Sequence, residues 1–273
     1  MSGVRESERF GLSGLPFSGA CALAAACLVE LGDAGPAQDL LRRGEAAASV
    51  ANHLYSKVPL AIARGRLLTL YGEITEVVRV MEPIVAICRE HNFVGQTMRA
   101  LTVLGDAYAA AGRASEAVPL VQEAIQLQES AAAFVDRALW VRTLGEAYRQ
   151  AGQLGEAERT AHTALEFARR NGEQANEAWT RFLFGEIAAD REDQEAARRH
   201  LEQARELAAG LGMRPLVAQC HFRLAAVARR GGAKDEARGH LQTATQMFAE
   251  MDMHAALAKA RAQAAKPGEG LAE

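Results

Sequence analysis

The sequence predicts an all-α fold, a right-handed superhelical solenoid of six helix pairs with 40-residue repeats and a short C-terminal closing helix. Two observations lead to this prediction. The 273 residues are dominated by strong helix formers such as Ala, Leu, Glu and Arg, and long β-branched runs are absent. The same short motif also recurs at a fixed spacing, which is the mark of a repeat architecture.

Six copies of the motif follow one another without insertion or deletion. The clearest copies are Leu104–Tyr108 and Leu144–Tyr148, which differ only in Asp against Glu. Because antiparallel helices approach within about 8–10 Å only where facing side chains are small, two further columns predict a close helix pair in each repeat. The turn column is Gly32, Gly72, Gly112, Gly152, Glu192 and Gly232, and the small-residue column is Ala37, Val77, Ala117, Ala157, Ala197 and Ala237.

Each element can be justified in chain order. Residues 1–17 form a lead-in, and the first helix runs from Ser18 to Leu31. Gly112 suits the left-handed residue that ends a first helix, and Ser115 suits the N-cap of the second. A closing helix begins at His254 and ends at Lys266, so that residues 258–273 hold its end and a tail. The repeats are predicted at 18–57, 58–97, 98–137, 138–177, 178–217 and 218–257.

The order of Leu-Gly, Tyr, Gly, Ala, an apolar residue and Ala resembles the tetratricopeptide (TPR) pattern. Three phrases extend the resemblance, namely Arg9–Leu12, Asn171–Glu173 and Leu211–His221. They are similar to the C-terminal TPR region of bacterial multidomain signalling proteins, in which an adenylate/guanylate cyclase domain and an AAA-type ATPase domain precede the repeats. The resemblance implies a regulatory module in bacterial signalling. The cyclase and ATPase residues lie upstream of these repeats, so neither activity is carried over.

Composition and motifs exclude several classes of function. A net charge of −3 without a basic stripe argues against nucleic acid as the partner. The longest apolar stretch, Ala20 to Leu31, is too short to span a membrane. Irregularly spaced cysteines without a C-x-x-C pair are typical of reduced thiols in a cytoplasmic protein. No catalytic, metal-binding or phosphate-binding motif occurs, so we predict a protein that is not an enzyme and has no cofactor.

In a TPR solenoid, the first helices line the concave side, and we predict the partner-binding site there. One inward column holds Asp106, Glu146 and Glu186, and a neighbouring column holds Arg142 and Phe182. The predicted partner-binding residues are Arg66, Arg99, Asp106, Arg142, Glu146, Arg149, Trp179, Phe182, Glu186 and Phe222.

Each part of this site has a simpler alternative. Arg142 and Glu146 could form an ion pair with each other across one helical turn. The aromatic side chains Trp179, Phe182 and Phe222 could instead pack between neighbouring repeats.

The predicted function is therefore a non-catalytic scaffold for a protein or peptide partner. The alternative is a sensor that holds a small ligand or peptide effector in its groove. The first helix, Ser18 to Leu31, has one charged residue in fourteen. The terminal helix of a solenoid needs a polar outer face, so we predict that this end is an interface through which the chain self-associates.

Overall fold

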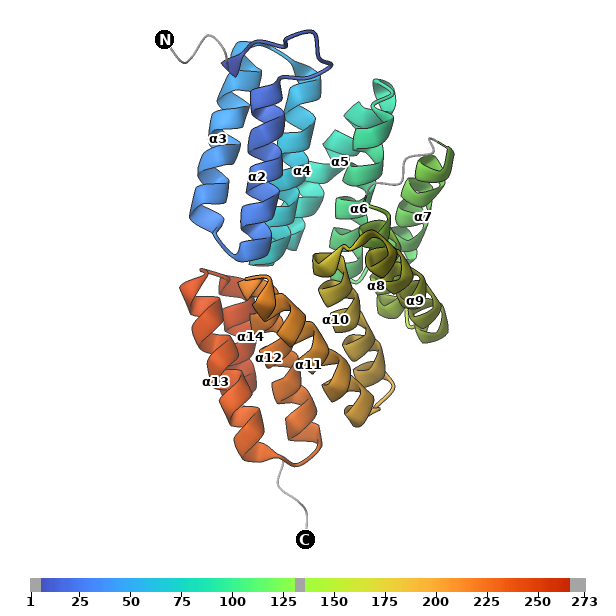
Figure 1. Ribbon diagram of the computed structural model, residues 1–273, viewed down its shortest axis with the longest axis vertical. Coiled ribbons are helices and arrows are strands. Elements are labelled where there is room, and N and C mark those ends of the chain that lie inside the picture. Colours follow the sequence, from blue (N-terminus) through green and yellow to red (C-terminus); the bar gives the residue numbers. More distant parts are fainter. Residues whose placement is uncertain (1–5, 131–135, 266–273) are drawn as a thin grey trace.

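The computed structural model describes residues 6–130 and 136–265, and the regular elements within these residues are all α-helices. They form six antiparallel pairs and a closing helix (Figure 1), which confirms the predicted fold class. The first helices of the pairs are α2 (Pro16–Leu31), α4 (Leu54–Tyr71), α6 (Val94–Ala110), α8 (Arg137–Gln150), α10 (Gln174–Asp190) and α12 (Arg214–Arg230). The second helices are α3 (Ala34–Val50), α5 (Ile74–Glu90), α7 (Ala114–Ser130), α9 (Leu154–Asn171), α11 (Gln194–Gly210) and α13 (Lys234–Glu250), and the closing helix is α14 (His254–Ala265).

The turns repeat the same backbone geometry. Gly112 ends α6 in the left-handed region at φ 77°, and Gly212 ends α11 at φ 71°. The N–H group after such a residue bonds back to a carbonyl five residues earlier, as from Met213 to Ala208 at 2.9 Å. This is the Schellman arrangement, which satisfies the last carbonyls of a helix. Each turn that lies wholly within the described residues has this arrangement. A repeat has two such turns, the first between the two helices of a pair and the second between one pair and the next.

The turns between repeats explain where the helix pairs begin. Asn52 and Asn92 have positive φ and stand at this second turn position. As a result α4 begins at Leu54 and α6 at Val94, a few residues ahead of the starts at 58 and 98 that the motif phase predicted. Among the described residues only Gly172 and Gly212 give the plain Gly signal at this position, whereas Asn52, Asn92 and Asp252 adopt the left-handed region without it.

Small residues bring the two helices of a pair together. Ala157 and Ala197 are fully buried in the small-residue column. A Cβ atom added at Gly185 of α10 would lie 2.6 Å from Cγ of Leu201 on α11, closer than real Cβ contacts. Side chains larger than those present would therefore force the paired helices apart.

The solenoid curves because its two layers of helices pack differently. First helices of neighbouring repeats, such as α2 and α4 or α6 and α8, contact one another, whereas second helices contact one another little. The first helices therefore form the tight inner layer, and the second helices form the splayed outer layer. This inner layer is the concave surface.

The curvature brings the two ends of the solenoid together, which the sequence did not predict. In Figure 1, α2 and α4 end directly against the helices of the last repeats. Nε1 of Trp179 on α10 donates a 2.9 Å hydrogen bond to Oε2 of Glu30 on α2. The turn at Gly32 lies against Met251, and Gly72 lies against Ala255. We call these contacts the closure.

The lead-in packs against the first two repeats. Leu15 is 2% exposed and joins the core cluster formed by α2, α3 and α4. Its backbone N–H donates a 2.8 Å hydrogen bond to Oγ of Ser56. The lead-in does not cover the outer face of α2, where Leu23 is 70% exposed and Cys27 is also exposed. Among the described helices, none has the length and hydropathy to cross a membrane.

Candidate functional site on the concave surface

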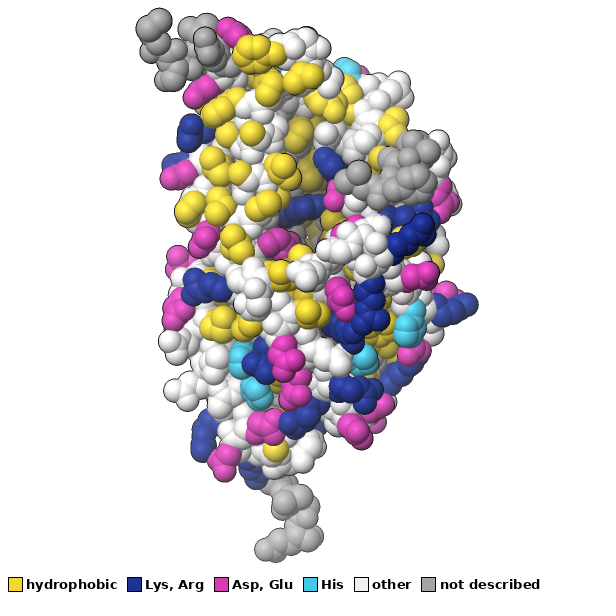
Figure 2. Space-filling view, viewed as in Figure 1, with side chains coloured by type: hydrophobic (Ala, Val, Ile, Leu, Met, Phe, Trp, Pro, Cys, Tyr) yellow, Lys and Arg dark blue, Asp and Glu magenta, His cyan; other side chains and the backbone are white. Residues whose placement is uncertain are grey.

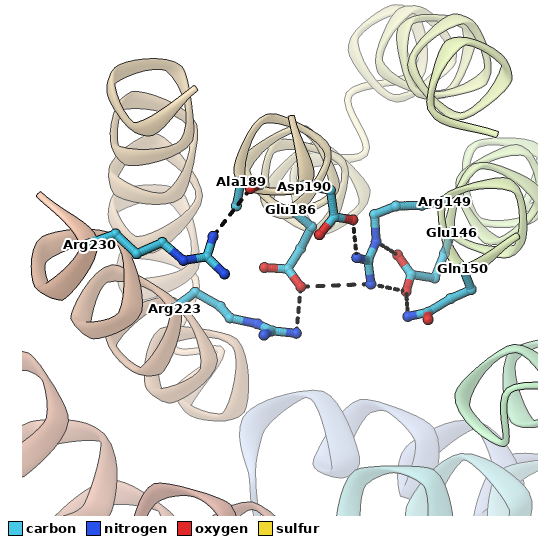
Figure 3. Close-up of polar contacts among 8 residues, drawn as sticks. All are labelled: Glu146, Arg149, Gln150, Glu186, Ala189, Asp190, Arg223 and Arg230. Atoms are coloured by element: carbon cyan, nitrogen blue, oxygen red, sulfur yellow. Dashed lines mark hydrogen bonds and ion pairs between the residues drawn. The ribbon is translucent and has the colours of Figure 1, made fainter. Parts of the chain in front are cut away.

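An ion-pair network crosses three successive first helices of the concave surface (Figure 3). Glu146 on α8 accepts hydrogen bonds from Nε and Nη2 of Arg149 at 2.9 and 2.8 Å. Nη1 of Arg149 lies 2.6 Å from Oδ2 of Asp190 on α10, and Nη2 lies 3.8 Å from Oε2 of Glu186. Nη2 of Arg223 on α12 lies 2.5 Å from that same Glu186 oxygen. We call these five residues the concave charged network.

The centre of the network is shielded from water. The side chains of Arg149 and Glu186 are 9% and 5% exposed. Burial raises the pKa of Glu186 above its ordinary value, although the charges of Arg223 and Arg149 oppose the rise. Burial alone would lower the pKa of Arg149, but the hydrogen bond and charge of Glu146 and the charge of Glu186 raise it. The network therefore places acidic and basic side chains where desolvation disfavours their charged forms.

A second polar group lies at the middle of the surface, around Asp106 on α6. Burial raises the pKa of Asp106 to about 6, while Arg142 and Arg66 lower it and Glu146 raises it. The guanidinium of Arg142 on α8 lies over the ring of Trp179, with Cζ 5.4 Å from the ring centroid.

The structure thus brings together most of the predicted charged residues. Arg66, Asp106 and Arg142 form one group, and Glu146, Arg149 and Glu186 belong to the other. The simpler alternative for Arg142 and Glu146 is not what the structure shows, because Glu146 bonds to Arg149 and Gln150 instead.

The remaining predicted residues make contacts outside the two charged groups as well. Trp179 and Phe182 meet edge to face with ring centroids 6.0 Å apart. Phe222 packs against Phe248 of its own helix pair at 6.2 Å, so that its simpler explanation as a packing residue is supported. Arg99 forms an ion pair with Asp136 at the start of α8, at 3.3 Å.

Sequence reasoning missed three residues that the site uses, namely Glu30, Asp190 and Arg223. Glu30 and Asp190 stand one helical turn beyond the inward column that holds Glu186. Extending that column by four residues would therefore have found both, since residues four apart share a helix face. Arg223 follows directly after an inward position, and no periodic signal marks it.

Possible metal ligands are sparse in the described part of the chain. His221 and His240 approach each other with their Nδ1 atoms 2.8 Å apart. No group of three or more His, Cys, Asp or Glu side chains in residues 6–130 and 136–265 is arranged to hold a metal ion.

The family follows from a match over most of the repeats. Residues 59–266 match the family described as the MalT-like TPR region, which is well over half of the chain. The chain belongs to the MalT-like TPR family. No curated protein matches the chain. Membership in the MalT-like TPR family confirms the tetratricopeptide part of the resemblance seen in the sequence.

Solved structures share the fold of this MalT-like TPR chain at low sequence identity. BtubC from P. vanneervenii is 19% identical with a TM-score of 0.54, covering 82% of this chain and 91% of BtubC. NprR in complex with its cognate peptide NprX is 15% identical with a TM-score of 0.68, covering 89% and 70%. A Rap protein complexed with competence and sporulation factor is 12% identical with a TM-score of 0.66, covering 89% and 80%. These likenesses show the solenoid fold.

Proposed function

We propose that the chain is a non-catalytic regulatory scaffold that binds a protein or peptide segment on its concave surface. The observation that carries the proposal is the concave charged network. Burying ionised groups such as Arg149 and Glu186 opposes folding unless each is well paired. The first and last repeats place Ala26 and Ala226 in the column of Glu186, so the packing of helices does not require charge there.

The structural relatives support the same proposal. NprR was solved with its cognate peptide NprX. Its fold covers most of this chain, and curved repeat proteins use their concave surfaces to bind extended partners. A peptide lying along α6, α8 and α10 would meet the charged groups first and the aromatic pair Trp179 and Phe182 next.

Affinity selection from a pool of random twelve-residue peptides tests the proposal with the intact chain. We expect retained peptides to slow amide hydrogen exchange in the first helices α6, α8 and α10 more than in the second helices α7, α9 and α11. The proposal is refuted if no peptide is retained above a bare-resin control, or if protection falls on the second helices.

A sensor of small effectors is the second candidate, and the closure favours it. The contact between Glu30 and Trp179 joins the two ends of the superhelix, so that the first helices surround the concave surface. A small ligand should raise the melting temperature at concentrations well above its dissociation constant. A thermal-shift screen in which metabolites raise the midpoint and the selected peptides do not would favour the sensor over the scaffold.

We further propose that this chain acts within bacterial cytoplasmic signalling, together with a nucleotide cyclase and an AAA-type ATPase. The support is the resemblance of Arg9–Leu12, Asn171–Glu173 and Leu211–His221 to such proteins. Chemical cross-linking in the source cell followed by mass spectrometry tests this context. Cross-links to a cyclase or ATPase domain are expected, and their absence among well-detected cross-links of this chain would count against it.

We also propose that the outer face of α2 is a self-association surface. Figure 2 shows hydrophobic side chains gathered over α2 and α3, and Leu23 stands exposed among small residues such as Ala20 and Ala24. A two-fold interface places one surface against itself, and a face without charges meets no repulsion from its own copy. Small side chains also allow two helices to approach closely.

Light scattering coupled to gel filtration tests self-association at micromolar concentrations. A dimer is expected for the wild-type chain and a monomer for Leu23→Glu. Val50→Glu on α3, where the side chain is 81% exposed, is the control that stays dimeric. A strict monomer of the wild-type chain contradicts the proposal.

A further inference from the structure

Two arginines of the concave surface have no anionic partner in contact with them. Within the described residues, no hydrogen bond or ion pair reaches Arg66 on α4 or Arg142 on α8, whereas Arg149 and Arg223 each contact a carboxylate. Asp106 lies between them in the order of the first helices and acts on both through its charge without contact. We call Arg66 and Arg142 the inner arginine pair.

Arg142 is the more unusual member of the pair. Its Nε atom is buried and has no hydrogen-bond partner in the described structure. A buried donor left unpaired loses the free energy of hydration without replacement. The Trp179 ring covers one face of the guanidinium, and Glu30 holds this ring by its Nε1 hydrogen bond. The guanidinium is thus held in place, while no hydrogen bond in the described structure occupies its Nη groups.

The charges around the pair favour an anion. The concave charged network contains three carboxylates against two guanidinium groups, and these contact one another. Asp106 lies within electrostatic range of both arginines, but no carboxylate of the described residues contacts either guanidinium group of the inner arginine pair. Guanidinium groups bind carboxylates with two parallel hydrogen bonds, and these charge-assisted bonds are stronger than neutral ones.

We propose that the inner arginine pair binds a carboxylate of the peptide that occupies the concave surface, with an apolar side chain of the same peptide packed on Trp179 and Phe182. This inference rests on the proposed function, because it assigns the chemistry of the peptide that the scaffold binds. The carboxylate is either the C-terminal group or an acidic side chain.

The test uses a pool of random hexapeptides in two forms, one with a free C-terminal carboxylate and one with a C-terminal amide. Each pool is passed over the immobilised intact chain, and retained peptides are sequenced by mass spectrometry. The variants are Arg66→Gln and Arg142→Gln, and Arg142→Lys keeps the charge without the paired donors. The matched control is Arg238→Gln on the outer helix α13, where the side chain is 78% exposed. Circular dichroism confirms that each variant is folded.

We expect the wild-type chain and the Arg238→Gln control to retain carboxylate-bearing peptides at least tenfold better than either inner variant. Retention of the free-acid pool alone identifies the C-terminal group, and enrichment of Asp or Glu in both pools identifies an acidic side chain. The inference is overturned if retained peptides bind equally to the inner variants, or if basic peptides are selected. If the wild-type chain retains no peptide, both this inference and the proposed function fail. If it retains peptides whether or not they carry a carboxylate, the inference fails and the proposed function stands.

Discussion

Replacement of Gly185 by Ala should destabilise the protein, although alanine is the better helix former. Gly185 lies in the interior of α10, where its missing side chain lets α11 approach. An added Cβ would lie 2.6 Å from Cγ and 2.7 Å from Cδ2 of Leu201, and 3.4 Å from its backbone nitrogen. Leu201 is fully buried, so its side chain cannot turn towards solvent to make room.

The magnitude follows from two opposing effects. Overpacking a core typically costs about 1–3 kcal/mol, and the change from Gly to Ala in a helix interior returns about 0.8–1.0 kcal/mol. Gly239 on α13 provides the matched control, because its helix position is also interior but an added Cβ would meet nothing within 4 Å. The difference between the two variants therefore isolates the packing effect, at about 1–3 kcal/mol.

Urea unfolding followed by far-ultraviolet circular dichroism measures both variants. We expect a lower midpoint than wild type for Gly185→Ala and a higher midpoint for Gly239→Ala, with unchanged slopes. Equal shifts for the two variants would refute the reasoning, because they would show that Gly185 does not set the distance between α10 and α11.

Three further predictions follow from the turns, the buried charge and the closure. Glu192→Gly should stabilise the fold by about 1 kcal/mol, because Glu192 has a φ of 65° that Gly adopts without strain; an unchanged urea midpoint contradicts this. The pKa of Asp106 is raised to about 6, chiefly by burial. The folded state therefore binds the carboxyl proton of Asp106 more tightly than the unfolded chain does. The free energy of unfolding of the wild type should fall relative to that of Asp106→Asn as the pH rises from about 4 to about 6. If urea unfolding gives the same pH dependence for both proteins, the raised pKa of Asp106 is wrong. Trp179→Phe removes the hydrogen bond to Glu30 and should increase the radius of gyration in small-angle X-ray scattering, while Trp140→Phe, inside the α6–α8 core, should not.

The repeat could be predicted from the sequence because its signals are local. Gly32 and Ala37 each report a backbone or packing requirement of their own repeat, and six copies reinforce one another. The inward face of residues such as Asp106 and Glu146 also follows from helical periodicity alone. The partners of those residues do not, because Arg149 could equally have bonded along its own helix or across to α10, and the structure has it do both.

The closure could not be predicted for a different reason. Glu30 and Trp179 are 149 residues apart. Their meeting depends on a small rotation at every repeat between them, and small errors in each rotation accumulate along a solenoid. A single charged residue, Glu30, was visible in the otherwise apolar sequence of α2, but its partner lay beyond the reach of any local pattern.

The closure also sets an order of events during synthesis on the ribosome. In an open solenoid each new helix pair completes the one before it, and an early pair is finished as soon as its neighbour emerges. Here the end of α2 at Glu30 and Gly32 gains its last contacts only after Trp179 and Met251 have been made. The first repeats must therefore hold their curvature while most of the chain is still to come. Met251 and Ala255 complete the closure, so a chain released before Met251 would leave the ends of α2 and α4 exposed to solvent.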